Sequence, residues 1–408
     1  MRGQADTAAT TGTSRTPARG PRPRLKAVVW ERTGDELRVV YDRREQLIID
    51  DEAGVVEALL ELLHAGGRTV AELADALTAA GRPVGADDVA EAVAAFDAHG
   101  LLEDGDRLGR LAPEDAERHF SSLSFFQSFA SLSRSREDFQ ESLRNAHVLV
   151  LGTGGFNSNL LPHLCGLGVG RLTLLDRDAV EPRNFARQYL YRWSEIGQRK
   201  VARAVEWVRA FDPSIDVRGI DAGIEGPEQL ADLLDEVRPD VVADGIDHPG
   251  EVDSWVNAAC VSRGVPFVRG GMWVTEGLVW SVDPGRSACL QCASLPDPDA
   301  ADLDAATATA LAGLTLHDVR QPRTNRGIGP VAGLLGALGA FEVLRYLTAF
   351  EPPAYAGSSL VIDFAAGCAM RQQSWPRDPA CTVCGPTALG AGSGVHRDAV
   401  AAPIGGGR

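Results

Sequence analysis

The sequence predicts an α/β protein whose main part is a Rossmann-like, mostly parallel sheet with helices on both faces. A small winged-helix-like α+β domain precedes it. From about residue 146 onward, short apolar strands alternate with helical patterns, and the glycine turn "GTGG" (152–155) directly follows the first of these strands. Such alternation is typical of a parallel sheet covered by helices. The chain has 408 residues, enough for two hydrophobic cores.

The composition excludes several classes of protein. The formal net charge is −16, whereas a general nucleic-acid surface is basic, so we expect no nucleic-acid partner. The apolar run at 331–341 is shorter than the roughly 20 residues that a membrane span needs, so we expect a buried helix and no membrane partner. The N-terminus lacks the continuous apolar core of a signal peptide, which suggests a cytoplasmic protein.

The first ordered region is predicted at 25–105, after a disordered tail at 1–24. Two apolar runs flank the turn-rich "ERTGDE" and predict a hairpin, "QLIID" offers a third strand, and three helical patterns follow. "LLEDGDRLG" (101–109) could form the wing. The helices carry Asp and Glu more than Lys and Arg, so we expect this domain to bind protein or peptide instead of DNA.

A linker and helix at 106–145 lead to the larger domain, predicted at 146–386 and followed by a second disordered tail at 387–408. Its strands are expected at 146–151, 171–176, 215–221, 241–244 and 266–271, separated by helices. "LVWSVD" and "SLVIDF" suggest further strands, for which an antiparallel direction is open.

The glycine turn has the character of a phosphate-binding turn. Glycines between a strand and a helix let the backbone approach a phosphate, and the helix amides donate to it. The turn contains Gly152, Gly154 and Gly155, and Asn157 stands where a last glycine is usual. Asparagine tolerates left-handed backbone angles, so we expect the turn to keep its shape. On this motif alone, a tight turn without a ligand remains an alternative.

Charged residues recur at the strand ends downstream. Asp176 ends the next strand, where a carboxylate can accept the hydroxyls of a ribose. The motif N-x-x-R-Q, the start of the following helix and the end of strand 241–244 supply further polar side chains: Asn184, Arg187, Gln188, Lys200, Asp244 and Asp247. Cations that neutralise phosphate oxygens, together with an aspartate that holds Mg²⁺, suit a nucleoside triphosphate such as ATP.

Four of the seven cysteines form two CxxC pairs: Cys289, Cys292, Cys381 and Cys384. In a reducing compartment this spacing indicates a metal site instead of disulfides. Two such pairs suit a closed tetrahedral zinc site.

In this order, "GTGG", "DRD", "NFARQ", "RK", "GIDH", "CLQC" and "CTVC" resemble the motifs of the ubiquitin-activating-enzyme-like superfamily of adenylating enzymes, which includes ThiF, MoeB and HesA. The resemblance covers about 146–386. It implies an ATP-dependent adenylyltransferase that forms an acyl adenylate and pyrophosphate, and a homodimer. It also implies roles for individual residues: ribose binding by Asp176, a place in the nucleotide site for Asp178 and Gln188, phosphate contacts from Asn184, Arg187 and Lys200, Mg²⁺ binding by Asp247, and zinc binding by the four paired cysteines.

The sequence departs from the family pattern at three places. Asn157 replaces a glycine. The family's R-x-x-R-Q element reads "RHFSSLSFF" here: Arg118 is present but serines follow, and Arg134 or Arg136 could substitute. Members that form a thioester use a cysteine in the loop over the active site, and the corresponding stretch here, 293–327, contains none. We therefore expect the acyl adenylate to pass to an oxygen or nitrogen nucleophile, or to a partner modification enzyme.

The N-terminal region resembles the PqqD-like domains that bind the leader of a ribosomally made precursor peptide as an added strand. Joined to an adenylating domain, it is similar to peptide-maturation enzymes of the microcin C adenylating type and to the partner proteins of azoline-forming cyclodehydratases. The resemblance implies adenylation of a carboxylate on a precursor peptide. Two alternatives remain: a non-catalytic leader-docking subunit of a cyclodehydratase, and a sulfur-carrier adenylyltransferase.

Overall fold

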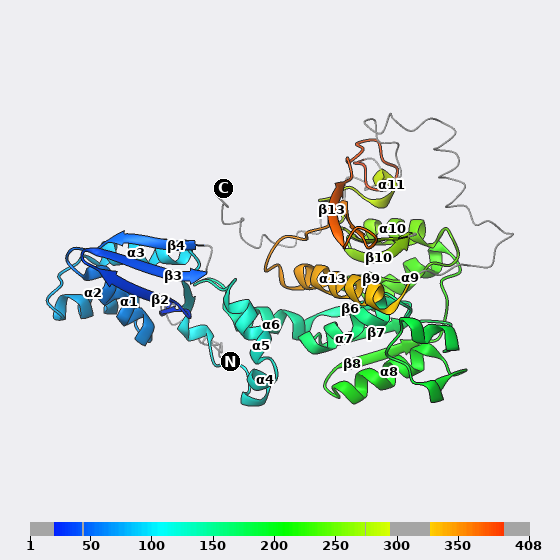
Figure 1. Cartoon of the computed structure of the whole chain (residues 1–408), viewed down its shortest axis with the longest axis horizontal. Helices are drawn as coiled ribbons and strands as arrows, with labels where there is room; N and C mark the ends of the chain where they lie inside the picture. Colours follow the sequence, from blue (N-terminus) through cyan, green and yellow to red (C-terminus); the bar gives the residue numbers. More distant parts are fainter. Residues whose placement is uncertain (1–19, 43–44, 274, 294–326, 387–408) are drawn as a thin grey trace, which may run out of the picture. The chain divides into compact units, whose positions relative to one another are not determined.

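The computed structural model describes residues 20–42, 45–273, 275–293 and 327–386, which form two compact units (Figure 1). The first unit comprises residues 1–115 and 123–137, and the second comprises 116–122 and 138–408. The expected tail at 387–408 and the stretch at 294–326 lie outside the described residues.

The first unit contains a three-stranded antiparallel meander and three helices. Strands β2, β3 and β4 pair in this order, which agrees with the expected hairpin and third strand. The helices α1, α2 and α3 follow, and Thr69 and Glu72 form the expected capping box at the start of α2. The bounds are β2 Val29–Thr33, β3 Glu36–Asp42, β4 Glu45–Asp50, α1 Val55–Ala65, α2 Val70–Ala79 and α3 Ala86–Ala98.

A second, two-stranded sheet closes this unit. Strand β1 (Pro23–Leu25) pairs antiparallel with β5 (Leu102–Asp104). Pro23 and Arg24 therefore belong to a strand, so the predicted tail at 1–24 extends too far. β5 lies within the stretch expected to form the wing, and it returns the chain to the beginning of the unit.

The region between the expected domains contains three helices instead of a linker and one helix: α4 (Pro113–Arg118), α5 (Phe120–Gln127) and α6 (Arg136–Asn145). The carboxylate of Glu137, on α6, accepts hydrogen bonds from the backbone N–H groups of Gly109, Arg110 and Leu111, at 2.7, 2.8 and 3.2 Å. The stretch expected to be a loose connection is thus fixed by a buried side chain.

The second unit is built on an eight-stranded sheet with the order β13-β12-β11-β10-β9-β6-β7-β8. Strands β10, β9, β6, β7 and β8 run parallel, whereas β11, β12 and β13 are antiparallel to their neighbours. This confirms the predicted α/β fold; β13 was not expected. The bounds are β6 His147–Leu151, β7 Arg171–Leu175, β8 Asp216–Ile220, β9 Val241–Asp244, β10 Phe267–Trp273, β11 Glu276–Val282, β12 Ser358–Asp363 and β13 Ala369–Ser374.

Helices cover the sheet (Figure 1). Leu149 and Leu151 of the fully buried strand β6 share one core with apolar residues of α9 and α10, because alternate side chains of a strand point to the same face. The α-helices from residue 157 onward in the described part of this unit are α7 Asn157–Leu167, α8 Lys200–Phe211, α9 Pro227–Val237, α10 Val252–Arg263, α11 Leu290–Ala293 and α13 Gly329–Thr348.

The apolar run at 331–341 lies in α13, which is 20 residues long. Among the described residues, α13 is the one helix long and apolar enough to cross a membrane by length and composition. However, 56% of its apolar window is buried inside the protein. A Cβ at Gly336 would lie 2.8 Å from Asn159, and one at Gly339 would lie 2.4 Å from Phe156. These glycines let α13 pack closely against α7, which fits the expected core helix.

Candidate functional site

Three loops meet where the parallel strands β7, β6 and β9 end. These strands are neighbours in the sheet, so the glycine turn after β6, the loop after β7 and the loop after β9 leave from the same edge. In open α/β sheets, ligands bind outside this carboxyl edge. The structure thereby brings together the chain segments that carry the residues predicted from the sequence.

The glycine turn depends on two different residues. Gly152 has φ = +77°, and a Cβ there would lie 2.9 Å from Ile246, so the position requires glycine. Asn157 has no left-handed backbone; it is the first residue of α7. Its Nδ2 donates to the carbonyls of Leu151, Gly152 and Ala243, at 2.9, 2.8 and 3.1 Å. The expected reason for asparagine was wrong: its amide ties the end of β6 to that of β9.

Asp176 braces the glycine turn. Its Oδ2 accepts hydrogen bonds from N and Oγ1 of Thr153, both at 2.7 Å, and its Oδ1 accepts one from N of Asp178 at 2.8 Å. Since a carboxylate offers about four acceptor positions, about one is left for a ribose hydroxyl. The hydroxyl of Tyr191 lies 2.8 Å from both O and Oγ1 of Thr153, and burial raises the pKa of Tyr191. Thr153 and Tyr191 were not predicted as site residues.

Lys200 and Asp178 form a pair at the start of α8. The Nζ of Lys200 lies 3.0 Å from Oδ2 of Asp178, and the backbone N of Lys200 donates to O of Asp178 at 2.9 Å. The lysine side chain is 6% exposed and the aspartate side chain 61%. The ammonium is therefore held in the protein, while its partner can turn toward solvent or a ligand.

The N-x-x-R-Q loop is shaped by its asparagine. Oδ1 of Asn184 accepts from N of Glu181 at 2.8 Å, and O of Asn184 accepts from N of Arg187 and of Gln188 at 3.0 and 2.9 Å. Gln188 is buried, and its Oε1 has no hydrogen-bond partner in the described part of the chain. A buried acceptor without a partner, close to the glycine turn, fits a ligand or ordered water that supplies the missing donor.

The Arg187 side chain lies against the glycine turn. A Cβ at Gly155 would lie 3.1 Å from its Nε. Asn159 fixes this contact, since its Nδ2 donates to the carbonyls of Gly155 and Arg187 at 2.7 and 2.9 Å. Burial lowers the pKa of Arg187, and the negative charge of Asp247 opposes that shift. Arg187 and Asp247, from different loops, are thus electrostatic neighbours. The role of Asn159 was missed in the sequence, although it lies two residues after Asn157.

The loop after β9 holds a buried and an exposed carboxylate. Asp244 is fully buried beside Arg269 of β10, and burial raises its pKa to about 6. Asp247 is exposed. Arg269 was not predicted. A signal was available, because an arginine within the apolar stretch "PFVRGG" needs a buried partner.

Two of the three arginines considered for the R-x-x-R-Q element, Arg118 and Arg136, are engaged elsewhere. Arg118 forms an ion pair with Asp212 and donates to O of Cys165 at 3.1 Å. Arg136 forms an ion pair with Glu103 at 3.0 Å. The cysteine-free stretch at 293–327 lies outside the described residues except at its two ends.

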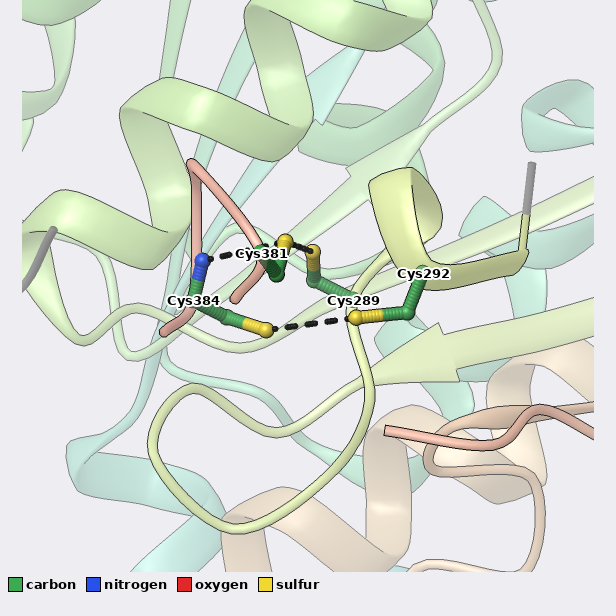
Figure 2. Close-up of side chains that lie close together, drawn as sticks. All are labelled: Cys289, Cys292, Cys381 and Cys384. Atoms are coloured by element: carbon green, nitrogen blue, oxygen red, sulfur yellow. Dashed lines mark hydrogen bonds between the residues drawn. The ribbon is translucent and has the colours of Figure 1, made fainter. Parts of the chain in front are cut away.

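The four paired cysteines form one cluster (Figure 2). Their sulfur atoms all lie within 4.8 Å of one another, with Cys289–Cys381 at 3.7 Å and Cys292–Cys384 at 3.5 Å. Tetrahedral Zn–S bonds of about 2.3 Å place sulfurs about 3.8 Å apart, whereas a disulfide needs about 2.05 Å. The donor set therefore fits a zinc ion.

The thiols of the cluster differ. Burial raises the pKa of Cys289. Burial also acts to raise the pKa of Cys381, but backbone N–H groups of Cys384 and Val383, 3.5 and 3.4 Å from its sulfur, lower it to about 7. Cys381 thus becomes a thiolate, the form that binds metal, most readily.

The structure thus combines a Rossmann-like sheet, polar loops at the carboxyl edge of its parallel strands and a buried four-cysteine cluster. The pattern of the ThiF family matches residues 127–383, nearly two thirds of the chain. The chain belongs to the ThiF family of adenylyltransferases.

Named relatives agree with this assignment. The molybdopterin-synthase adenylyltransferase of Escherichia coli is 32% identical over 250 residues, 61% of this chain and 90% of that protein. The adenylyltransferase and sulfurtransferase MOCS3 of Sus scrofa is 35% identical over 246 residues, 60% of this chain and 50% of that protein. The chain thus spans half the length of MOCS3.

The fold is similar to that of E. coli MccB solved with ATP, at a TM-score of 0.67 and 20% identity, over 89% of this chain and all of that one. PaaA gives a TM-score of 0.58 at 19% identity, over 69% of this chain and 90% of that one. At these identities the likeness concerns the fold alone.

Proposed function

We propose that this protein uses ATP to adenylate a carboxylate on a ribosomally made precursor peptide. The observation that supports the nucleotide chemistry is that three charged segments contact one glycine turn. Arg187 lies against Gly155, and Ile246, next to Asp247, lies against Gly152. Asp176 accepts hydrogen bonds from both Thr153 and Asp178, and Asp178 pairs with Lys200. A dehydrogenase has no evident need for such a set, whereas a triphosphate does.

The reaction follows from these groups. A peptide carboxylate oxygen attacks the α-phosphorus of ATP, the bond from that phosphorus to the bridging oxygen breaks, and pyrophosphate leaves. Arg187 and Lys200 neutralise the phosphate oxygens, and Asp176 accepts a ribose hydroxyl and orients the nucleotide. Mg²⁺, held by Asp247, would supply further charge neutralisation on the phosphates. Zinc bound by Cys289, Cys292, Cys381 and Cys384 would be structural, because four thiolates leave no open position.

The first unit supports a peptide substrate. In its described part, β2 and β4 each pair on one side only, with β3. Arg32 of β2 forms ion pairs with Asp51 and with Glu57 of α1, which tie β2 to the helix. β4 instead offers a free row of backbone groups beside the half-buried Leu47 and Ile49. We propose that the leader adds as a strand to β4 and raises the local concentration of the peptide's reacting end.

The solved structures of MccB with its peptide MccA, E. coli "MccB + SeMet MccA" among them, favour the same substrate class through the likeness of fold. The curated relatives favour a second candidate, a sulfur-carrier protein, because one of them is named a sulfur carrier protein ThiS adenylyltransferase. A cytoplasmic homodimer remains our expectation for either substrate.

The deciding experiment measures ATP–pyrophosphate exchange with two kinds of substrate: short peptides encoded by reading frames adjacent to this gene and a ThiS-type sulfur carrier. We expect exchange with the peptide only. Exchange with the carrier only would establish the second candidate. Exchange with neither, together with peptide binding, would indicate the non-catalytic docking role.

The docking edge is tested in the full-length protein by labelled-peptide binding. Ile48→Asp on β4 should weaken peptide binding by about tenfold, since a charge enters the docking strand, and should leave ATP binding unchanged. Val29→Asp on β2 is the matched control, because Val29 and Ile48 are both exposed, at 69% and 53%. Equal affinities for the two variants and the wild type would contradict docking at β4.

A further inference from the structure

Arg269 lies beside the loop that carries Asp247, although the predicted site did not contain it. In the parallel pairing of β10 with β9, Arg269 is directly opposite Asp244, the last residue of β9. Its side chain therefore starts at the point where β9 ends and its loop begins.

The guanidinium of Arg269 joins three parts of the structure. Its NH1 lies 3.0 Å from Oδ2 of Asp244 and donates to O of Ile246 at 2.6 Å. Its NH2 forms an ion pair at 2.9 Å with Asp253, in the first turn of α10. The planar fork of arginine can serve a strand end, a loop carbonyl and a helix at once, which the single ammonium of lysine cannot.

Burying the charged groups of this network costs desolvation free energy, which counts against a purely stabilising role. Asp244 is fully buried and the Arg269 side chain is 13% exposed. Burial acts to lower the pKa of Arg269, but the charges of Asp244, Asp253 and Asp247 outweigh it and raise that pKa. A buried ion pair is often no more stable than apolar residues in its place, so its retention calls for another role.

The role follows from what holds Asp247. No hydrogen bond to its carboxylate is present within the described residues, so its position depends on the main chain of its loop. That main chain is fixed by Gly245 N to Leu151 O at 2.9 Å, by Ile246 N to Asp244 Oδ1 at 3.2 Å, and by Arg269 to Ile246 O. Arg269 thus binds the residue directly before Asp247.

We propose that Arg269 is the positioning residue of Asp247: it fixes the 245–248 loop so that the Asp247 carboxylate faces the Mg²⁺ of a bound nucleotide. This inference rests on the proposed function. Arg269 itself touches neither nucleotide nor metal in this role.

The test compares Arg269→Met and Arg269→Lys with Asp247→Asn. Calorimetry measures the affinity for a non-hydrolysable ATP analogue with Mg²⁺ and with EDTA, and hydrogen exchange follows the 245–248 amides without nucleotide. We expect Arg269→Met to reduce the Mg²⁺-dependent gain in affinity by about tenfold or more, with the EDTA affinity within about twofold of wild type. Exchange of the loop amides should accelerate. Arg269→Lys, which keeps the charge without the fork, should restore the gain only in part.

The matched control is Arg263→Met. Arg263, on α10, also holds an aspartate through two nitrogens, Nε and NH2 to Asp235 of α9 at 2.8 and 2.7 Å. Its loss should leave the Mg²⁺-dependent gain and the exchange of the 245–248 amides unchanged. If Arg269→Met does not fold, Asp253→Asn removes one arm of the network and should show the same effects in smaller measure.

The outcomes separate the two proposals. Suppose that Asp247→Asn loses the Mg²⁺-dependent gain in nucleotide affinity and Arg269→Met keeps it. This result would overturn the role of Arg269 and leave that of Asp247 intact. Wild-type protein without any Mg²⁺-dependent gain overturns the proposed nucleotide chemistry and, with it, this inference. Unchanged loop exchange in Arg269→Met also contradicts the inference.

Discussion

The candidate nucleotide site and the cysteine cluster differ in how open they are and in what holds their residues in place. At the carboxyl edge of β6, β7 and β9, the candidate nucleotide site is open, and its charged groups come from separate loops that are held by hydrogen bonds to main-chain atoms. The cysteine cluster is closed: all four sulfurs are buried, and the cysteines belong to the same core as Trp280 and residues of α9 and α10. From this difference we propose that the first site performs chemistry while the second stabilises the fold. Three predictions can break or sharpen this contrast.

The largest expected effect is on stability at the cysteine cluster. Cys289→Ser should remove the bound zinc and lower the melting temperature strongly, because a structural zinc contributes on the order of 10 kcal/mol in small domains. ATP binding by the protein that remains folded at low temperature should be unchanged. Metal analysis and thermal unfolding measure both effects.

Cys260→Ser is the control for this prediction. Cys260 is equally buried, but its thiol lies outside the cluster. Cys260→Ser should therefore lower the melting temperature less than Cys289→Ser, by the amount that burying one hydroxyl costs. Equal losses in the two variants, or a folded wild-type protein without zinc, would contradict a structural metal.

The next effect is on chemistry at the open site. Asp247→Asn should lower ATP–pyrophosphate exchange by about a hundredfold or more, since the anchor of a metal that stabilises the transition state is lost. The melting temperature should stay the same because Asp247 is exposed. Asp235→Asn, at an exposed aspartate on α9 paired with Arg263, should change neither quantity. A variant with near wild-type exchange would mean that Asp247 is not the anchor.

The smallest effect concerns Asn157, which joins the end of β6 and the glycine turn of the open site to β9. Asn157→Gly restores the residue usual in the family but loses three hydrogen bonds and adds glycine to a helix. The free energy of unfolding should therefore fall by about 2–4 kcal/mol. Denaturant unfolding measures the change.

Asn157→Asp sharpens this last prediction. It keeps the shape of the side chain, but an oxygen replaces the Nδ2 that faces three carbonyls, so we expect a loss of stability at least as large. A glycine variant as stable as the wild type would show that the amide hydrogen bonds contribute nothing.

The sequence could predict features that depend on neighbouring residues, but not contacts between residues that are far apart along the chain. A few neighbouring residues are enough to recognise the glycine turn at position 152 and the two CxxC pairs. Asp176 and Asp247 can also be recognised locally, because each follows a predicted strand whatever the order of the strands in the sheet. The partnership of Arg269 with Asp244 depends on which strand lies beside β9, and the amide of Asn157 reaches a carbonyl 86 residues away. β13 was missed because "AMRQQS" is exposed throughout and lacks an apolar alternation.

The cysteine cluster also links two parts of the chain that are far apart in the sequence. Cys289 and Cys381 are 92 residues apart, as are Cys292 and Cys384. With zinc bound, the cluster would close a loop of that length. A permanent cross-link closing such a loop lowers the entropy of the unfolded chain and thereby stabilises the fold by about 4.7 kcal/mol. A backbone cut anywhere between Cys292 and Cys381 would then leave two fragments joined through the metal. A cut before β12 would leave the two fragments in contact through the pairing of β11 with β12 as well, so the metal would add to an existing interface between them.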